Sequence, residues 1–185
     1  MTTFDFGYGP VPAHQHPRGG GWVADTARVE DSAYIGPDAR VYGDARVYGD
    51  AQVSGGARVT DNAQVYGNAR VSGDAQVTDN AQVYGNAQVS GNAWVSDNAQ
   101  VSDNARVYGD AKLAKSSDYL LIGPIGSRAD FMTWTRSDNC IATGCFRGTV
   151  KEFLAAVKET HGDNAHAKAY RAAVRLIRMM EKAHD

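Results

Sequence analysis

The chain has 185 residues, of which 43% are apolar, and carries a formal net charge of −2. This apolar content is enough for a core in one or two small domains, so a long disordered chain is excluded. No apolar run is long enough to span a membrane, two cysteines are too few for a disulfide framework, and the small net charge argues against general nucleic-acid binding. We therefore expect a cytoplasmic protein with reduced thiols.

Residues 1–22 contain three prolines and a run of three glycines, a composition that resists regular structure. We expect a flexible arm or a cap over whatever follows. Phe4, Phe6 and Tyr8 alternate along this segment and could cover an open end of the next domain. Such covers are needed at the ends of repeat proteins.

From Val23 to Leu113 an aliphatic residue occupies every sixth position, and an alanine stands four residues after each one as far as Ala111. The pattern continues for 15 consecutive units. A period of six fits neither a helix nor a coiled coil, and the many Gly-Asn and Asp-Asn pairs would interrupt a helix repeatedly. Ala-x-Val instead predicts a short strand with both named residues pointing inward, followed by a turn.

A second period of 18 residues appears on the outward positions. The turn Thr60-Asp61-Asn62, for example, is repeated at Thr78-Asp79-Asn80. Three strands that close a triangular coil would produce this period, whereas a flat sheet would not. The sequence over residues 23–113 therefore predicts a parallel β-helix of about five triangular coils.

The repeat resembles the hexapeptide-repeat superfamily, which implies a left-handed parallel β-helix and assembly into trimers. Many members are acyltransferases, and the resemblance would imply a catalytic histidine in or near the coils. There is no histidine between Trp22 and Ala114. We therefore expect the β-helix to be a scaffold and not an enzyme, with no cofactor.

Residues 18 positions apart should lie above one another on the β-helix. Tyr48, Tyr66 and Tyr84 would then form an exposed column, which is either ordinary strand decoration or, together with Trp94, a homo-oligomer interface. A second column contains Asp61, Asp79 and Asp97. Turn aspartates usually accept neighbouring backbone N–H groups, so we expect no metal there.

Residues 119–185 lack the repeat and predict a small α+β domain of the order β-β-β-α-α. The expected strands cover residues 119–122, 131–136 and 140–146. Thr149 and Glu152 form a capping-box pattern that opens a helix through about His161, and a second helix begins near Asn164.

Residues that suit an anionic ligand gather in this second domain, whose net charge of +3 over residues 113–185 contrasts with −5 over residues 1–112. A glycine-containing loop after the first strand supplies a hydroxyl and a guanidinium, as in many phosphate sites. The candidate ligand-binding residues are Ser127, Arg128, Asp130, Arg147, Thr160 and His161. The competing interpretation pairs Arg128 with Asp130 or Glu152 on the surface and gives His161 no role beyond the helix end.

The segments around Gly123-Pro124-Ile125-Gly126-Ser127-Arg128 and Thr160-His161-Gly162-Asp163 resemble a small module of phage and prophage proteins. This resemblance implies a phage protein in a bacterial host cell and carries no secure activity. The architecture is compatible with a non-catalytic oligomer that sequesters a phosphorylated ligand such as a nucleotide immune signal, which is the function we favour. Two alternatives stay open. One is an acyltransferase with His161 as the base, and the other is a structural phage protein or protein adaptor.

Overall fold

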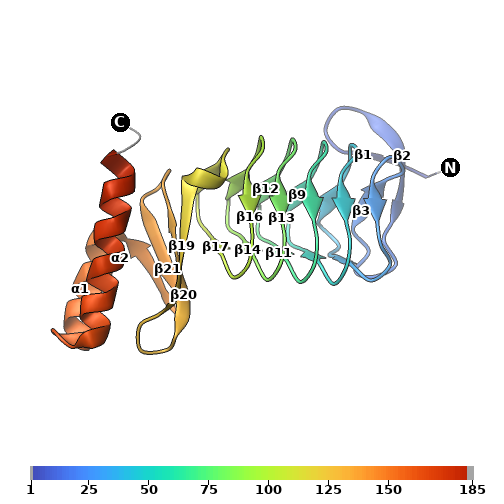
Figure 1. Cartoon of the computed structure of the whole chain (residues 1–185). Coiled ribbons are helices and arrows are strands. Elements are labelled where there is room, and N and C mark those ends of the chain that lie inside the picture. The colour runs from blue at the N-terminus through green and yellow to red at the C-terminus, as the bar shows by residue number, and fades with distance from the viewer. Residues whose placement is uncertain (1, 183–185) are drawn as a thin grey trace. The chain divides into compact units, whose positions relative to one another are not determined.

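A computed structural model describes residues 2–182 of the chain, coloured from blue to red in Figure 1. It divides between Ser116 and Ser117 into two compact units, which we call the solenoid unit and the C-terminal unit. Among the described residues, no helix is long and apolar enough to cross a membrane.

The solenoid unit consists of very short strands arranged in three sheets. The first sheet contains, in spatial order, β1 (Thr3–Asp5), β2 (Pro10–Gln15), β3 (Trp22–Ala24), β6 (Arg40–Val41), β9 (Arg58–Val59), β12 (Gln76–Val77), β15 (Trp94–Val95) and β18 (Lys112–Leu113). The second contains β4 (Arg28–Val29), β7 (Arg46–Val47), β10 (Gln64–Val65), β13 (Gln82–Val83) and β16 (Gln100–Val101). The third contains β5 (Tyr34–Ile35), β8 (Gln52–Val53), β11 (Arg70–Val71), β14 (Gln88–Val89) and β17 (Arg106–Val107).

The repeat strands pair in parallel with partners 18 residues away, as Gln64 does with Gln82 and Val65 with Val83. The alanine and valine of each unit point inward, and Ala63 and Val65 have no exposed surface. Asp61 occupies the left-handed region with φ 58°, which short polar side chains tolerate at turns. The structure thus confirms a β-solenoid of about five coils, whose core is built from small side chains.

The tyrosine column is less exposed than the sequence predicts. The Tyr48 and Tyr66 rings stack at a centroid distance of 4.8 Å, and Tyr66 and Tyr84 stack at 5.0 Å. Each ring therefore covers its neighbour, and all three residues are half-buried. Trp94 is 44% exposed and donates its indole N–H to the Thr78 hydroxyl at 3.1 Å. Whether these residues form an interface stays a prediction.

The carboxylates of the aspartate column accept hydrogen bonds between the turns of successive coils. Asp61 accepts the backbone N–H of Asp79 at 3.4 Å, and Asp79 accepts that of Asp97 at 3.3 Å. Residues 2–182 contain no group of three or more His, Cys, Asp or Glu side chains placed to hold a metal ion.

The N-terminal segment is more regular than its composition suggests. β1 and β2 form an antiparallel hairpin, and β2 pairs in turn with β3, so the hairpin extends the first sheet. The Phe4 ring stacks on Trp22 at 4.5 Å, and Phe6 is buried. The hairpin is therefore regular strand structure that packs on the first sheet through its aromatic side chains.

The C-terminal unit is a four-stranded antiparallel sheet followed by two helices. After the short turn η1 (Ser116–Asp118), the elements are β19 (Tyr119–Ile125), β20 (Asp130–Thr135), β21 (Cys140–Thr143), β22 (Phe146–Thr149), α1 (Val150–His161) and α2 (Ala165–Lys182). The single strand expected over residues 140–146 is wrong, because a turn at Gly144 and Cys145 divides it. The helix start is as predicted, since Thr149 and Glu152 form a capping box.

Both helices pack on the sheet through a core that includes Trp134, Ile141, Phe153, Tyr170 and Ile177. Trp134 is fully buried, and its indole N–H donates to Asn139 at 2.9 Å. This core fixes the ends of α1 and α2 against the loop between β19 and β20, where the candidate residues lie.

Candidate functional site

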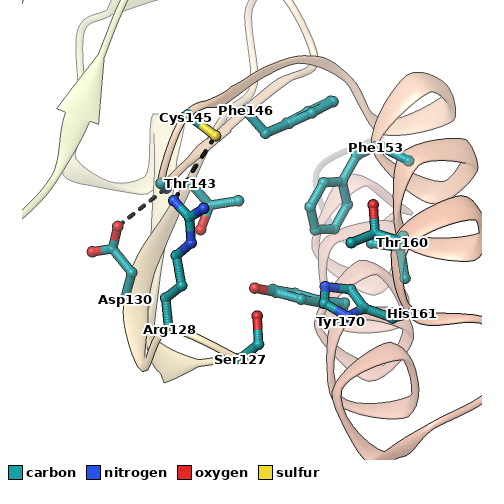
Figure 2. Close-up of a pocket in the computed structure, with 13 residues that line it drawn as sticks. Ser127, Arg128, Asp130, Thr143, Cys145, Phe146, Phe153, Thr160, His161 and Tyr170 are labelled. Carbon is teal, nitrogen blue, oxygen red and sulfur yellow. Dashed lines mark hydrogen bonds between the residues drawn. The ribbon is translucent and has the colours of Figure 1, made fainter.

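A cavity of about 210 Å³ opens in the C-terminal unit, and we call it the Arg128 pocket. The loop between β19 and β20 and the turn between β21 and β22 form one side, and α1 and α2 form the other (Figure 2). Its lining includes the apolar side chains of Phe146, Phe153 and Val157. The pocket therefore has an apolar wall with polar groups facing one another across it.

Most of the residues predicted from the sequence line this pocket together: Ser127, Arg128, Asp130, Thr160 and His161. Arg147 does not. Successive residues of a strand point to opposite faces, so Phe146 lines the pocket while Arg147, opposite Ala142 in the sheet register, lies on the other face. Burial raises the pKa of the Cys140 thiol, and the charge of Arg147 acts against this rise.

The Arg128 side chain extends along the rim of the pocket. Its guanidinium donates a long hydrogen bond to the Cys145 sulfur at 4.0 Å (Figure 2). Neither expected ion pair forms among the described residues. Asp130 accepts the N–H groups of Phe131 at 2.8 Å and Gly144 at 3.1 Å, and Glu152 is occupied by the capping box.

Tyr170 forms part of the pocket floor and was missed as a site residue, because its position on α2 predicts only a place in the core. It is 8% exposed, and its ring packs edge-on against Phe153 at 5.3 Å. A Cβ atom at Gly126 would overlap the Tyr170 hydroxyl, so the loop can approach the ring closely only with glycine at this position.

The Tyr170 hydroxyl points into the pocket (Figure 2) and has no hydrogen-bond partner within residues 2–182. Burial raises the pKa of this phenol, Asp130 raises it further, and Arg128 opposes them. The hydroxyl is therefore neutral at physiological pH and can donate a hydrogen bond. No buried side-chain nitrogen or oxygen of the described residues lacks a hydrogen-bond partner, so this unpartnered hydroxyl lies on the accessible surface of the pocket, where it can bond to water or to a ligand.

Three more polar side chains in the pocket, those of Ser127, Thr160 and His161, make no hydrogen bond to the described part of the chain. The His161 ring lies beside Tyr170 with centroids 5.8 Å apart. Together with Arg128 and Tyr170, these side chains supply hydroxyl, imidazole and guanidinium groups from both sides of one cavity. Such a set suits the acceptor oxygens of an anion.

The architecture of the solenoid unit makes this chain a β-solenoid repeat protein. A family model described as the YdcK beta solenoid repeat matches residues 39–55, 63–79, 81–97 and 99–111. The solenoid unit is thus similar to that family, and the match does not reach the Arg128 pocket. No curated protein and no solved structure matched the chain.

Proposed function

We propose that the C-terminal unit binds a small phosphorylated ligand in the Arg128 pocket and that the solenoid unit serves as its scaffold. The observation that carries the proposal is the Tyr170 hydroxyl, which is held in a buried ring and directed into the cavity without a protein partner. Arg128 supplies a positive charge on the same cavity that no carboxylate of residues 2–182 neutralises by an ion pair.

A phosphate group matches this chemistry because it offers three acceptor oxygens. Arg128 and Ser127 can donate from the loop, while Tyr170 and Thr160 can donate from the helices. Phe146 and Phe153 provide a surface on which a flat ring can rest. Asp130 brings a negative charge to one side, so the part of the ligand near it carries a neutral group or a hydrogen-bond donor.

The size of the pocket limits how much ligand it encloses. Pockets that hold a whole drug-sized molecule measure roughly 300–1,000 Å³, and this one measures about 210 Å³. It therefore encloses one end of a nucleotide, and the remainder projects outward. A nucleotide immune signal in a phage-infected bacterium is the biological ligand we favour, with a trimeric solenoid that multiplies the pockets.

Native mass spectrometry of gently purified protein tests the proposal directly. We expect an oligomer, in multiples of three chains, that carries a nucleotide-sized mass. Calorimetric titration with adenosine 5′-monophosphate should then show binding that adenosine, which lacks the phosphate, does not reproduce. Arg128→Gln should weaken this binding about 10-fold or more, because hydrogen bonds to charged groups contribute roughly 1.5–3 kcal/mol.

Arg175→Gln provides the matched control, because Arg175 is an exposed arginine of α2 that does not line the pocket. It should leave the affinity unchanged. Equal losses of affinity in both variants would show that the effect comes from long-range charge, and this would contradict binding in the Arg128 pocket. A wild-type protein that carries no nucleotide and binds neither adenosine 5′-monophosphate nor inorganic phosphate would overturn the proposed function.

A further inference from the structure

The N-terminal end of the solenoid leaves one of its three sheets uncovered. The hairpin strand β2 pairs with β3 and so continues the first sheet. Residues 18–21 cover the third, where Gly21 donates its N–H to Ile35 and Ile35 donates to Arg18. In the second sheet β4 is the edge strand, and no strand of the described chain pairs with its outer side.

The backbone of β4 presents unsatisfied groups at this edge. Arg28 and Glu30 donate their N–H groups inward along the solenoid to Ala45 and Val47, each at 2.9 Å. The alternation of a parallel strand then directs the Ala27 and Val29 carbonyls and the Val29 N–H outward. No hydrogen bond to these three groups is found within residues 2–182. An edge of this kind is a template for another strand.

A groove of about 450 Å³ lies along the same edge. Ala27 and Val29 line it and are half-buried, whereas their equivalents one coil on, Ala45 and Val47, have no exposed surface. Ala27 and Val29 thus leave apolar surface open in the groove. An added strand would cover this surface, as each later coil covers the one before it.

Two arginines give the groove its charge. Arg28 and Arg46 also line it, and they are neighbours in the sheet register. Both are exposed, and neither forms an ion pair or hydrogen bond through its side chain with the described residues. Glu30, the acidic residue of the groove, accepts the Gly49 N–H at 2.9 Å. The next three positions of this column are glutamines, so the positive charge is confined to the open edge.

We propose that the open β4 edge binds an extended acidic peptide segment of a partner protein, which adds a strand to the second sheet. In the register of the solenoid, an acidic residue of the peptide lies beside Arg28 and donates its backbone N–H to the Ala27 carbonyl. The residue two positions later lies beside Glu30, where a neutral polar side chain avoids like-charge repulsion, and it donates its backbone N–H to the Val29 carbonyl. Small aliphatic residues between and before them cover Ala27 and Val29. Backbone pairing supplies affinity in such complexes, and alternate side chains supply specificity.

A fluorescently labelled, acetylated seven-residue peptide of sequence Val-Gln-Val-Glu-Val-Gln-Val, whose glutamate lies beside Arg28, tests this with the full-length protein. We expect saturable binding by fluorescence anisotropy. The double variant Arg28→Gln/Arg46→Gln should weaken it about 10-fold or more, and Arg58→Gln/Arg70→Gln, which changes exposed arginines of the other two sheets, should not. The same peptide with its glutamate and the following glutamine N-methylated, so that neither can donate to the edge, should fail to bind.

Hydrogen exchange adds a local measurement, because the peptide should slow exchange of the Val29 N–H. Equal binding of the N-methylated peptide, or equal losses in the two double variants, would overturn the proposal. Protection of the Val29 N–H that rises with protein concentration in the absence of peptide would do so too, because the occupant would then be a second copy of this chain. Arg128→Gln should leave peptide binding unchanged, so this test is independent of the proposed ligand pocket.

Discussion

The solenoid unit and the C-terminal unit treat their polar side chains in different ways. In the solenoid, several outward amide side chains are hydrogen-bonded to the residue at the equivalent position one coil on, as Asn68 donates to Asn86 at 3.4 Å. In the Arg128 pocket, the Tyr170 hydroxyl faces a cavity without such a partner. Stacked repeats satisfy many of their polar groups through one another. Groups that remain available for binding are therefore expected where the repeat ends. The Arg128 pocket and the β4 edge are two such places.

Val65→Asp should produce the largest effect and tests whether the two units are independent. Val65 is fully buried in the solenoid, so its replacement buries a carboxylate without a partner and should cost about 4 kcal/mol or more. Chemical denaturation should show early loss of the solenoid. The helical circular dichroism, which comes from α1 and α2, should still report unfolding of the C-terminal unit at the wild-type midpoint.

Gln64→Asp is the matched control, because Gln64 is the adjacent outward residue of the same strand. It should leave both transitions nearly unchanged. Simultaneous loss of helical signal in Val65→Asp would show instead that the two units unfold as one, and the contrast between them would then be one of surface chemistry alone.

Gly126→Ala should have the next largest effect, this time in the C-terminal unit. The added methyl group would overlap the Tyr170 ring, and Gly126 has φ 77°, which alanine adopts only with strain. We expect a loss of about 2–3 kcal/mol in the free energy of unfolding together with weaker ligand binding. Gly162→Ala has a similar φ of 55° but open space around it, so the difference between the two variants measures the overlap.

Tyr66→Ala tests whether the tyrosine column stabilises the solenoid on its own. Tyr66 stacks on both Tyr48 and Tyr84, whereas Tyr84 stacks only on Tyr66 within this column, at spacings that suit aromatic contacts worth roughly 0.5–1.5 kcal/mol each. Thermal unfolding should therefore give about twice the destabilisation for Tyr66→Ala as for Tyr84→Ala. A change in oligomer mass in either variant would support the predicted interface, and equal destabilisation would contradict additive stacking.

The solenoid could be predicted closely because its information is local and repeated. The aliphatic residue at every sixth position and the turn pattern at every eighteenth determine strand length, burial and register. The N-terminal segment could not be predicted in the same way. Its glycines indicate irregular structure, but Gly19 lies so close to the Ile35 carbonyl that a side chain would not fit, and this contact depends on the folded third sheet.

The Arg128 pocket was predicted in part for a similar reason. Ser127 and Arg128 stand in a conspicuous glycine loop, and His161 stands at a helix end, so composition marks them. Arg147 is an equally plausible candidate from the sequence. The turn at Gly144 and Cys145, however, determines which residues of β22 face the pocket, and it places Arg147 on the opposite face of the sheet. Tyr170 shows the reverse case, a site residue that the sequence predicts only as a core residue. Its ring belongs to the core, while its hydroxyl reaches the cavity.

Tyr170→Phe should have the smallest effect on stability and is the most discriminating variant for the pocket. The ring and its contact with Phe153 remain, and the hydroxyl that is removed has no partner in residues 2–182, so the free energy of unfolding should change by less than about 0.5 kcal/mol. Affinity for adenosine 5′-monophosphate should nevertheless fall about fivefold, because one hydrogen bond contributes roughly 1 kcal/mol. A clear loss of stability with unchanged affinity would mean that the hydroxyl serves the fold and not the ligand.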